Sequence, residues 1–520
     1  MSTKHIQDLW HFTNMATLLL PTEQYPWRVL IAVSVLLVGW YMISSIFAWR
    51  RLHHIPGPLL ASFSYVWVGR IASRGAFNKT YKDFEEKYGQ LVRVGPNELL
   101  TSDPELIRKM GSTKSTYSRG AWYEGNRLNP YHPTMFTILD TGKHDELKAH
   151  LTPGYSGRDV PDYELAVDEQ VSNMISLIRR KYISVPETGT FRHFTLIKPL
   201  MYFTLDVIFN LSVGKHTGGE PGCSELDDDP YGFYSTLEAY MPWMSMTSEV
   251  HWIRDIIYSS TFLRWFGPKE TDAKGMGAFT NPIIRQRFAE RESGIEKKQQ
   301  DMVASFMAHG LTQAQCEVET LFMFVAGSDT TAAAMKITML YILSTPRVYQ
   351  RLKAEIATAL REGKASSPIA QSEARALPYL QAVIYEGLRI RPVTASSLSK
   401  KVPPEGDTVH GKFIPGGTVI GANLSALLRS KKMFGDDADT FRPERFLGLE
   451  GGRLAEMRRN VELTFGYGRW MCAGKPIAFM ELNKVYFELL DPERPIISES
   501  YAVFKDVGLR VRATEARNLE

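Results

Sequence analysis

A stretch of 21 residues without a charged side chain, Val29 to Trp49, constrains this chain more than any other feature. At about 1.5 Å of rise per residue, a helix of this length crosses a hydrocarbon layer of roughly 30 Å. The stretch has no polar face, which a helix at the edge of a globular core would show. It is longer than the apolar part of a usual signal peptide and ends without a small-x-small cleavage site. The sequence therefore predicts a transmembrane helix.

The flanking residues predict how this helix is oriented. Arg50 and Arg51 follow it directly, whereas only Arg28 lies close on the other side. Because basic residues favour the cytoplasmic side of a membrane, we expect the rest of the chain to face the cytosol. The segment HIPGP, residues 54–58, places two prolines of fixed φ around a glycine. We expect this stiff elbow to set the angle between the anchor and the following domain.

Composition predicts one large domain and excludes several kinds of partner. No Pro-rich or Ser/Gly-rich linker and no repeat divides the chain after residue 60. The 61 basic and 57 acidic residues are too balanced for a nucleic-acid partner. Three cysteines without a CxxC pair argue against a disulfide framework and against structural zinc. The expected organisation is a tail over residues 1–28, a transmembrane anchor over 29–49, a proline hinge over 50–58 and a single domain over 59–520.

Hydrophobic periodicity predicts a mainly α fold with small β-sheets. Thr312 and Gln315 resemble a capping box that opens a long apolar helix ending at Ser344. Thr345 is expected to cap the next helix. The other expected helices cover residues 165–183, 193–212 and 282–308 and the segment that starts at Pro378. The expected strands cover residues 91–94, 412–414, 418–420 and 509–511.

The segment Phe465–Gly474, FGYGRWMCAG, places Cys472 where a thiolate is favoured. Gly466 and Gly468 allow a tight turn, and a helical stretch follows from Lys475. At a helix N-terminus, unpaired backbone N–H groups and the positive end of the dipole favour thiolate over thiol. A thiolate in an apolar loop is what an iron porphyrin needs as an electron-donating axial ligand. Cys223 and Cys316 lack such a context and are expected to be buried small hydrophobes.

This loop resembles the haem-binding loop of the cytochromes P-450. Three other motifs of that family occur in the same order: Ala326–Thr331 (AGSDTT) of its long central helix, Glu386–Arg389 (EGLR) and Phe441–Phe446 (FRPERF). The resemblance covers roughly residues 54–515 and is strongest for fungal microsomal members of the pisatin-demethylase-like type. It implies the cytochrome P-450 fold behind an N-terminal transmembrane helix, with haem b as cofactor.

The resemblance also implies roles for particular residues. Cys472 would be the axial ligand of the haem iron, and Asp329 and Thr330 would relay protons to bound dioxygen, which an acid beside an alcohol can do. Glu386, Arg389 and Arg445 would form a buried structural triad rather than a surface ion pair. The remaining expected haem contacts are His144, Lys148, Ala326, Gly327, Lys400, Phe465, Arg469 and Gly474.

The sequence departs from the family pattern in three places. Trp470 stands where most members carry the arginine that pairs with a haem propionate, and Arg469 lies one residue earlier. Lys148 and Lys400 keep a positive charge but lack the bidentate fork of arginine. The chain also passes from Leu490 directly into Asp491-Pro492, where related members usually have several more residues. A short deletion could have removed a turn there.

The resulting functional prediction is a monooxygenase that inserts one oxygen atom from dioxygen into an apolar small molecule, in fungal secondary metabolism. Its electrons would come from NADPH through a cytochrome P-450 reductase at the endoplasmic reticulum membrane, with the catalytic domain cytosolic. Two alternatives stay open. One is a haem-thiolate isomerase, dehydratase or peroxygenase that needs no reductase. The other is a haem-binding inactive member, disabled by the apparent deletion after Leu490.

Substrate contacts are expected from segments that are distant in sequence. They are the central helix near Phe322 and Ala326, the loop Val393–Ser396, and the segment near Tyr123 and Phe136, because mostly apolar pockets suit lipophilic ligands. The stretch Met241–Trp265 contains three tryptophans and three methionines. It is expected either to form a pocket roof that reaches the membrane interface or to be plain core packing.

Overall fold

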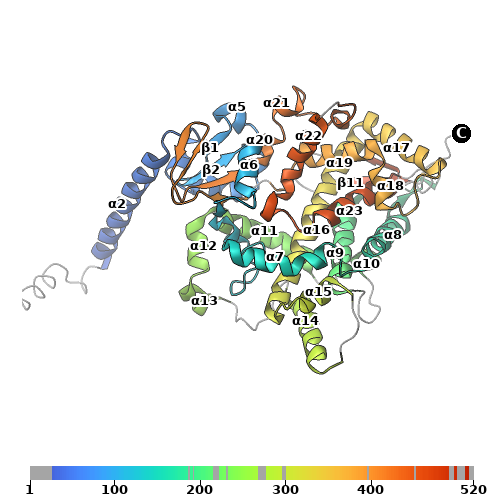
Figure 1. Ribbon diagram of the computed structural model, residues 1–520, viewed down its shortest axis with the longest axis horizontal. Helices are drawn as coiled ribbons and strands as arrows, with labels where there is room; N and C mark the ends of the chain where they lie inside the picture. Colours follow the sequence, from blue (N-terminus) through green and yellow to red (C-terminus); the bar gives the residue numbers. More distant parts are fainter. Residues whose placement is uncertain are drawn as a thin grey trace, which may run out of the picture.

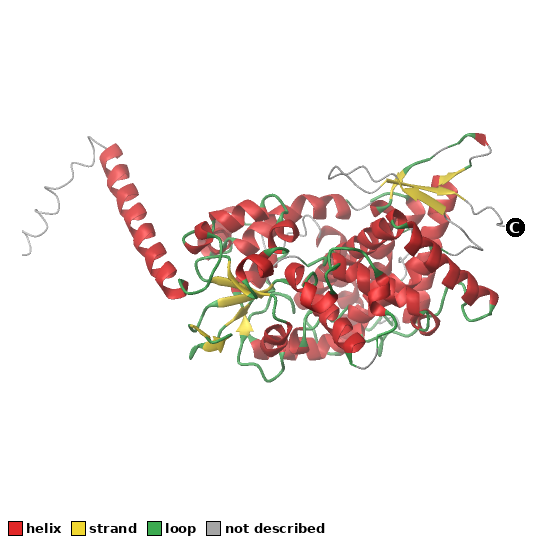
Figure 2. Cartoon of the chain, turned by 90° about the horizontal axis from the view of Figure 1, so that it is seen from above, coloured by secondary structure: helices red, strands yellow, loops and turns green. Residues whose placement is uncertain are grey.

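The computed structural model is mainly helical with small sheets, as the sequence predicts (Figures 1 and 2). The residues described are 26–185, 188–190, 192–214, 222–229, 232–267, 277–295, 300–394, 398–449, 452–490, 497–500 and 510–514. The α-helices are α2 (Pro26–Leu52), α3 (Val66–Ala72), α4 (Phe77–Tyr81), α5 (Phe84–Tyr88), α6 (Pro104–Gly111), α7 (Thr141–Tyr155), α8 (Tyr163–Tyr182), α9 (Ile197–Val213), α10 (Cys223–Leu226), α11 (Phe233–Glu249), α12 (His251–Ile257), α13 (Ser260–Phe266), α14 (Gly277–Glu292), α15 (Met302–Ala308), α16 (Gln313–Ser344), α17 (Pro346–Arg361), α18 (Gln371–Arg375), α19 (Pro378–Ile390), α20 (Leu424–Leu427), α21 (Lys431–Phe434), α22 (Arg453–Val461) and α23 (Lys475–Glu488). Short 3-10 helices are η1 (Leu59–Ser62), η2 (Ala121–Asn126), η4 (Pro443–Phe446), η5 (Glu462–Phe465) and η6 (Gly468–Trp470).

The two larger sheets lie at opposite ends of the molecule (Figure 2). The first has five strands in the order β1-β2-β9-β6-β3, and the second joins β10, β11, β4 and β5, while β7 and β8 form a separate hairpin. The strands are β1 (Leu91–Arg93), β2 (Glu98–Thr101), β3 (Ser118–Arg119), β4 (Ile183–Ser184), β5 (Phe194–Thr195), β6 (Lys400–Lys401), β7 (Asp407–Val409), β8 (Lys412–Ile414), β9 (Val419–Ala422), β10 (Ile497–Ser500) and β11 (Arg510–Thr514). Strands β3 and β6 pair antiparallel at the edge of the first sheet, and this pairing builds part of the candidate site.

Helix α16 runs through the centre of the molecule, between α9, α14, α19 and α23 (Figure 1). The expected capping box is confirmed, because Thr312 accepts from the N–H of Gln315 and the Gln315 side chain accepts from the N–H of Thr312. Two glycines permit close helix contacts. A Cβ on Gly327 would lie 2.7 Å from Ile208 of α9, and one on Gly387 would lie 2.0 Å from Thr338 of α16.

One predicted helix is wrong in its extent, and one predicted cap lacks its side-chain hydrogen bond. The helix expected over residues 282–308 is two helices, because α14 ends at Glu292 and the backbone turns at Gly294, where φ is +69°. A new helix, α15, begins after Asp301, whose carboxylate accepts from the N–H of Ala304 at 2.9 Å. Thr345 occupies the expected N-cap position of α17, but its side chain makes no capping hydrogen bond.

Helix α2 is the one described helix long and apolar enough to cross a membrane, and nearly all of it is exposed. It continues to Leu52, so the first three residues of the expected hinge are helical. At the other end of the chain, the junction over residues 491–496 and the apolar residues Tyr501, Val503 and Phe504 lie outside the described residues. Helix α23 stops at Glu488, and β11, which overlaps the strand expected over residues 509–511, pairs antiparallel with β10.

Candidate functional site

The loop before α23 folds because two glycines adopt conformations that other residues avoid. Gly466 and Gly468 have φ of +76° and +57°, and a Cβ on Gly468 would lie 2.3 Å from the carbonyl oxygen of Gly111. The N–H of Cys472 donates to the carbonyl of Phe465 at 2.7 Å and closes the loop. Cys472 then lies just before Gly474, the N-cap of α23, as the sequence predicts.

Cys472 differs from the other two cysteines in its surroundings. Its side chain is surrounded by protein but accessible from a cavity that it lines, whereas Cys223 and Cys316 are buried. Burial within the fold raises the pKa of the Cys472 thiol, and the N–H groups of Gly474 and Lys475 act in the opposite direction. The ammonium of Lys148 also lowers this pKa. A metal ion bonded to the sulfur would deprotonate it outright.

Lys148 fixes the Cys472 loop from α7. Its ammonium donates to the carbonyl oxygens of Arg469 and Met471, at 2.7 and 2.8 Å. The Arg469 guanidinium forms an ion pair of 3.2 Å with Asp145 and also donates to the carbonyl of Thr113. The expected haem contacts of Lys148 and Arg469 therefore stay predictions, because their partners in this structure are loop carbonyls and a carboxylate.

Two buried cations face each other across the edge of the first sheet. Arg119 on β3 is paired directly with Lys400 on β6, and both side chains are buried. Like charges at opposed positions of two strands destabilise a sheet. Burial lowers the pKa of Arg119 to about 10, and burial together with Arg119 lowers the pKa of Lys400 well below its usual value. An anion beside the two cations would relieve their repulsion and favour the charged form of Lys400.

Two aromatic residues complete this cation cluster. The Trp470 ring lies 4.4 Å from the Arg119 guanidinium carbon and 4.7 Å from the Lys400 ammonium. The Lys400 ammonium donates to the Tyr123 hydroxyl at 3.0 Å, and the ring centroids of His144 and Trp470 are 4.3 Å apart. Among the described residues, Arg119 Nε and Trp470 Nε1 are buried donors without a partner. The expected contacts His144 and Lys400 thus meet here.

Sequence reasoning missed Arg119 and assigned no role to Trp470. No motif marks Arg119, and its position opposite Lys400 depends on strand pairing between residues 281 positions apart in the numbering. Its guanidinium also donates to the carbonyls of Met135 and Ile138, at 2.6 and 2.9 Å. A local signal for this role is absent from the sequence.

The central helix presents the acid and alcohol expected from the sequence. Thr330 is exposed on a mostly buried helix, and its hydroxyl donates to the carbonyl of Ala326 at 2.8 Å. Burial raises the pKa of Asp329, and Lys336, two turns further along α16, acts to lower it. Gly327 packs against Ile208, so its first structural role is the contact between α9 and α16.

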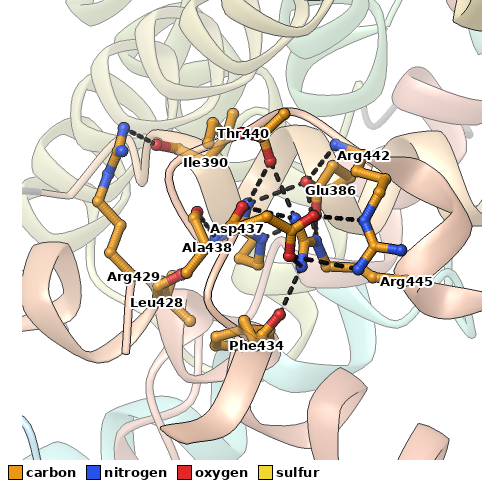
Figure 3. Close-up of polar contacts among 11 residues, drawn as sticks. Glu386, Ile390, Leu428, Arg429, Phe434, Asp437, Ala438, Thr440, Arg442 and Arg445 are labelled. Atoms are coloured by element: carbon orange, nitrogen blue, oxygen red, sulfur yellow. Dashed lines mark hydrogen bonds and ion pairs between the residues drawn. The ribbon is translucent and has the colours of Figure 1, made fainter. Parts of the chain in front are cut away.

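The triad of Glu386, Arg389 and Arg445 is buried and fully bonded (Figure 3). Glu386 receives two hydrogen bonds from Arg389, at 2.7 and 2.9 Å, and two from Arg445, both at 3.0 Å. The two guanidiniums also donate to carbonyl oxygens of residues Leu428, Phe434, Asp437, Ala438 and Thr440. The triad therefore ties α19 to the segment 428–445.

A cavity of about 760 Å³ opens beside the Cys472 loop. Four cationic side chains line it, namely Lys148, Arg375, Arg458 and Lys475, together with the single carboxylate Glu462. Lys475 pairs with Glu462 at 2.8 Å. The cavity reaches Cys472 from the side of α7, α19 and α23 and is predominantly positive.

The segments expected to contact substrate come together only in part. Phe136 stacks on Phe322 of α16, with centroids 5.1 Å apart, and lies edge-on to Tyr123 at the same distance. The loop Val393–Ser396 falls partly outside the described residues. In the stretch Met241–Trp265, the side chains of Trp243, Trp252 and Trp265 are 63%, 58% and 76% exposed. Plain core packing of these tryptophans is therefore ruled out.

Comparisons with known proteins agree with the motifs. A family model described as Cytochrome P450 matches residues 54–491. The protein named Cytochrome P450 monooxygenase aba1 from Botryotinia fuckeliana is 45% identical over 478 residues, which is 90% of this chain and 93% of that protein. Cytochrome P450 monooxygenase abl1 of Leptosphaeria maculans is 43% identical over 479 residues, 90% of this chain and 83% of that protein. Cytochrome P450 monooxygenase ABA1 of Pyricularia oryzae is 41% identical over 499 residues, 93% of this chain and 96% of that protein.

Proposed function

This chain belongs to the cytochrome P450 family and is a monooxygenase, and we propose that it inserts one oxygen atom from dioxygen into an apolar small molecule of fungal secondary metabolism. The family implies haem, and one observation carries the fit of the residues to it: the buried, like-charged pair Arg119–Lys400. The two carboxylates of a haem b would supply such an anion. The partnerless donors Arg119 Nε and Trp470 Nε1 would gain acceptors at the same place.

We propose Cys472 as the axial ligand and Arg119, Lys400, His144 and Trp470 as the residues around the propionates. A haem held there would supply reductive activation of dioxygen, which no side chain can perform. The role of the chain is to keep the sulfur in place through the loop bonds from Lys148 and the closure at Phe465. Contacts of Ala326, Gly327, Phe465 and Gly474 with the macrocycle belong to the same proposal.

Asp329 and Thr330 are proposed to move protons to the reaction site. The raised pKa of Asp329 lets its carboxyl hold a proton nearer to neutral pH than an exposed aspartate. The Thr330 hydroxyl donates to the Ala326 carbonyl and keeps its lone pairs available to accept. This intact pair favours a monooxygenase over the alternative of an isomerase, dehydratase or peroxygenase.

The electron donor is proposed to be an NADPH–cytochrome P450 reductase. The cationic cavity beside the Cys472 loop supports this partner, because an acidic docking surface would be attracted to it. The exposed, apolar α2 with Arg50 and Arg51 in its last turn supports a single-pass anchor with the domain in the cytosol. We propose the endoplasmic reticulum as the membrane, with residues 29–49 as the span, 50–58 as the hinge and 59–520 as the catalytic domain.

One set of measurements tests this proposal. The reduced chain should give the carbon monoxide band of a haem-thiolate, and NADPH with reductase should turn over a lipophilic substrate panel. Cys472→Ser should abolish the thiolate band, since an alcohol is a far poorer donor to iron, whereas Cys223→Ser and Cys316→Ser should keep it. A band that survives Cys472→Ser would remove this residue from its role. A thiolate band without turnover would favour a haem-binding inactive member. Turnover without NADPH would favour an isomerase, dehydratase or peroxygenase.

A further inference from the structure

The C-terminal end of the anchor helix is held by an arginine of the catalytic domain. Arg93, on β1, is completely buried, and its guanidinium donates to the carbonyl oxygens of Ala48 and Trp49 in the last turns of α2, at 2.9 and 3.2 Å. The same group donates to the carbonyls of Ser62 and Pro96, at 3.2 and 2.7 Å. One guanidinium thus joins the anchor helix, the 3-10 helix η1 and the loop after β1.

The chemistry of this contact is that of a charged helix cap. The last carbonyls of a helix lack partners within the helix, and the helix dipole makes that end negative. Arg93 donates to the carbonyl of Trp49. The carbonyl of Arg50 is bonded by the His53 ring, and that of Leu52 by the N–H of Ile55. A buried arginine is costly to desolvate, and here the cost is offset by five carbonyl acceptors, including Gly95.

Further contacts fix the direction in which α2 leaves the domain. The side chains of Tyr41 and Ser45, about two turns and one turn before Trp49, donate to the carbonyl of Phe63 at 3.1 and 3.0 Å. Arg51 donates to the carbonyl of Gly416, in the turn before β9. These bonds hold the helix at three separate points of the domain. A hinge at residues 54–58 alone would require none of them.

Exposed apolar side chains also occur at this end of the molecule. Leu59, Leu60 and Val66, next to the cap, are 73%, 67% and 76% exposed, and Trp252 and Trp265 of α12 and α13 are also exposed. Helices α12 and α13 lie at the end from which α2 leaves (Figure 1). We call these five residues the apolar face. Aromatic and aliphatic side chains of this kind suit the membrane interface, and the anchor supplies continuity with the bilayer.

We propose that Arg93 is a rigid joint that fixes the membrane anchor to the catalytic domain at one angle, so that the apolar face rests on the lipid surface. This inference rests on the membrane attachment in the proposed function. It replaces the elbow at Pro56–Pro58 as the element that sets the angle. The anchor is then part of the folded domain rather than a flexible tether.

The length of α2 makes this joint measurable. Its 27 residues span about 40 Å at 1.5 Å per residue. A swing of about 20°, comparable to a typical transmembrane tilt, would move the far end by roughly 14 Å and Leu36, about 20 Å from Trp49, by roughly 7 Å. Pulsed EPR distances between spin labels at Leu36→Cys on α2 and Phe413→Cys on β8 would detect it, since both positions are exposed. Cys223 and Cys316 are buried and Cys472 is the proposed iron ligand, which leaves the introduced pair to take the label.

The experiment uses the full chain in phosphatidylcholine nanodiscs. The expected result is one narrow distance distribution for the otherwise native chain and a broad one for Arg93→Gln. Arg70→Gln, which changes an exposed arginine on α3, is the matched control and should stay narrow. Insertion of four Gly/Ser residues after His53 should also leave the distribution narrow, because Arg93 binds carbonyls that precede the insertion. An insertion that broadens the distribution would show that the elbow sets the angle and would overturn the proposal.

Two more measurements keep the outcome decisive. Arg93→Lys keeps the charge but loses the branched guanidinium, so it should broaden the distance distribution less than Arg93→Gln. It replaces the glutamine variant in the experiment if that variant does not fold. A fluorescent label at Trp265→Cys should be quenched by spin-labelled lipid, while one at Leu165→Cys, exposed on α8, should not. An unchanged distribution in Arg93→Gln refutes the joint. The carbon monoxide band and turnover, recorded on the same samples, report failure of the proposed function separately.

Discussion

Replacing Glu386 with glutamine should destabilise the protein far more than its place in an i, i+3 ion pair suggests. The change removes the one carboxylate that two guanidiniums share, and none of its side chain is exposed. Arg389 and Arg445 would keep their carbonyl acceptors but would become buried cations. Among the described residues, the one ion pair left to them would join Arg445 to the partly exposed Asp437. Removing one partner of a buried ion pair costs about 3–5 kcal/mol, because the remaining charge is left without compensation.

The magnitude translates into a small but measurable shift in melting temperature. Unfolding entropy is about 2.1 cal/mol/K per residue, so a domain of about 460 residues gains roughly 1 kcal/mol/K. A loss of 3–5 kcal/mol then lowers the melting temperature by about 3–5 °C. We expect a parallel loss in the yield of haem-loaded protein, because the triad ties α19 to the segment 428–445.

The chain provides a matched control on its surface. Glu105 and Arg108 have the same i, i+3 spacing and an ion pair of 2.6 Å, but the Glu105 side chain is 80% exposed. Glu105→Gln should cost less than about 1 kcal/mol. The two variants would be compared by urea unfolding, by calorimetry and by the carbon monoxide band. If Glu386→Gln were no more destabilising than Glu105→Gln, the argument from the buried charge would be refuted.

Three further predictions concern the proposed site and a partly buried acid, Glu249. Thr330→Ala should lower the product formed per NADPH consumed by roughly tenfold or more, because a proton-transfer group is lost. Peroxide should increase, and the carbon monoxide band should not change. An unchanged ratio of product to NADPH would mean that the hydroxyl serves only to bond the carbonyl of Ala326. Lys400→Met should weaken haem binding about 10- to 100-fold, which corresponds to the loss of one charge-assisted hydrogen bond. The same change should raise the unfolding free energy of the haem-free chain, because it removes the repulsion from Arg119. A fall in both quantities would make Lys400 a packing residue. Burial raises the pKa of Glu249 to about 7, so the folded state binds the extra proton, and the unfolding free energy should fall as pH rises from about 4.5 to about 7. Glu249→Gln should flatten that dependence in urea titrations between pH 5 and 8, and an equal slope in both proteins would contradict the assignment.

Features that depend on neighbours in the sequence were determined by the sequence itself. The uncharged run from Val29, the capping box at Thr312 and the glycines around Cys472 each specify local backbone, and the structure contains all of them. The Glu386–Arg389 pair is likewise set by helix spacing, although only the fold buries it. Local sequence patterns suffice to predict these features because the interacting groups are only a few residues apart in the chain.

Features that join distant segments were decided only by the tertiary structure. The pairing of Arg119 with Lys400 depends on the register in which β3 lies against β6. Neither strand carries a sequence signal that identifies the other. The contact of Arg93 with the end of α2 depends on how β1 packs under the anchor. The break between α14 and α15 follows from the cap at Asp301, which competes with a continuous apolar pattern. Periodicity records which side chains are buried, but the partner of a buried charge depends on chain closure over tens to hundreds of residues, which local patterns do not encode.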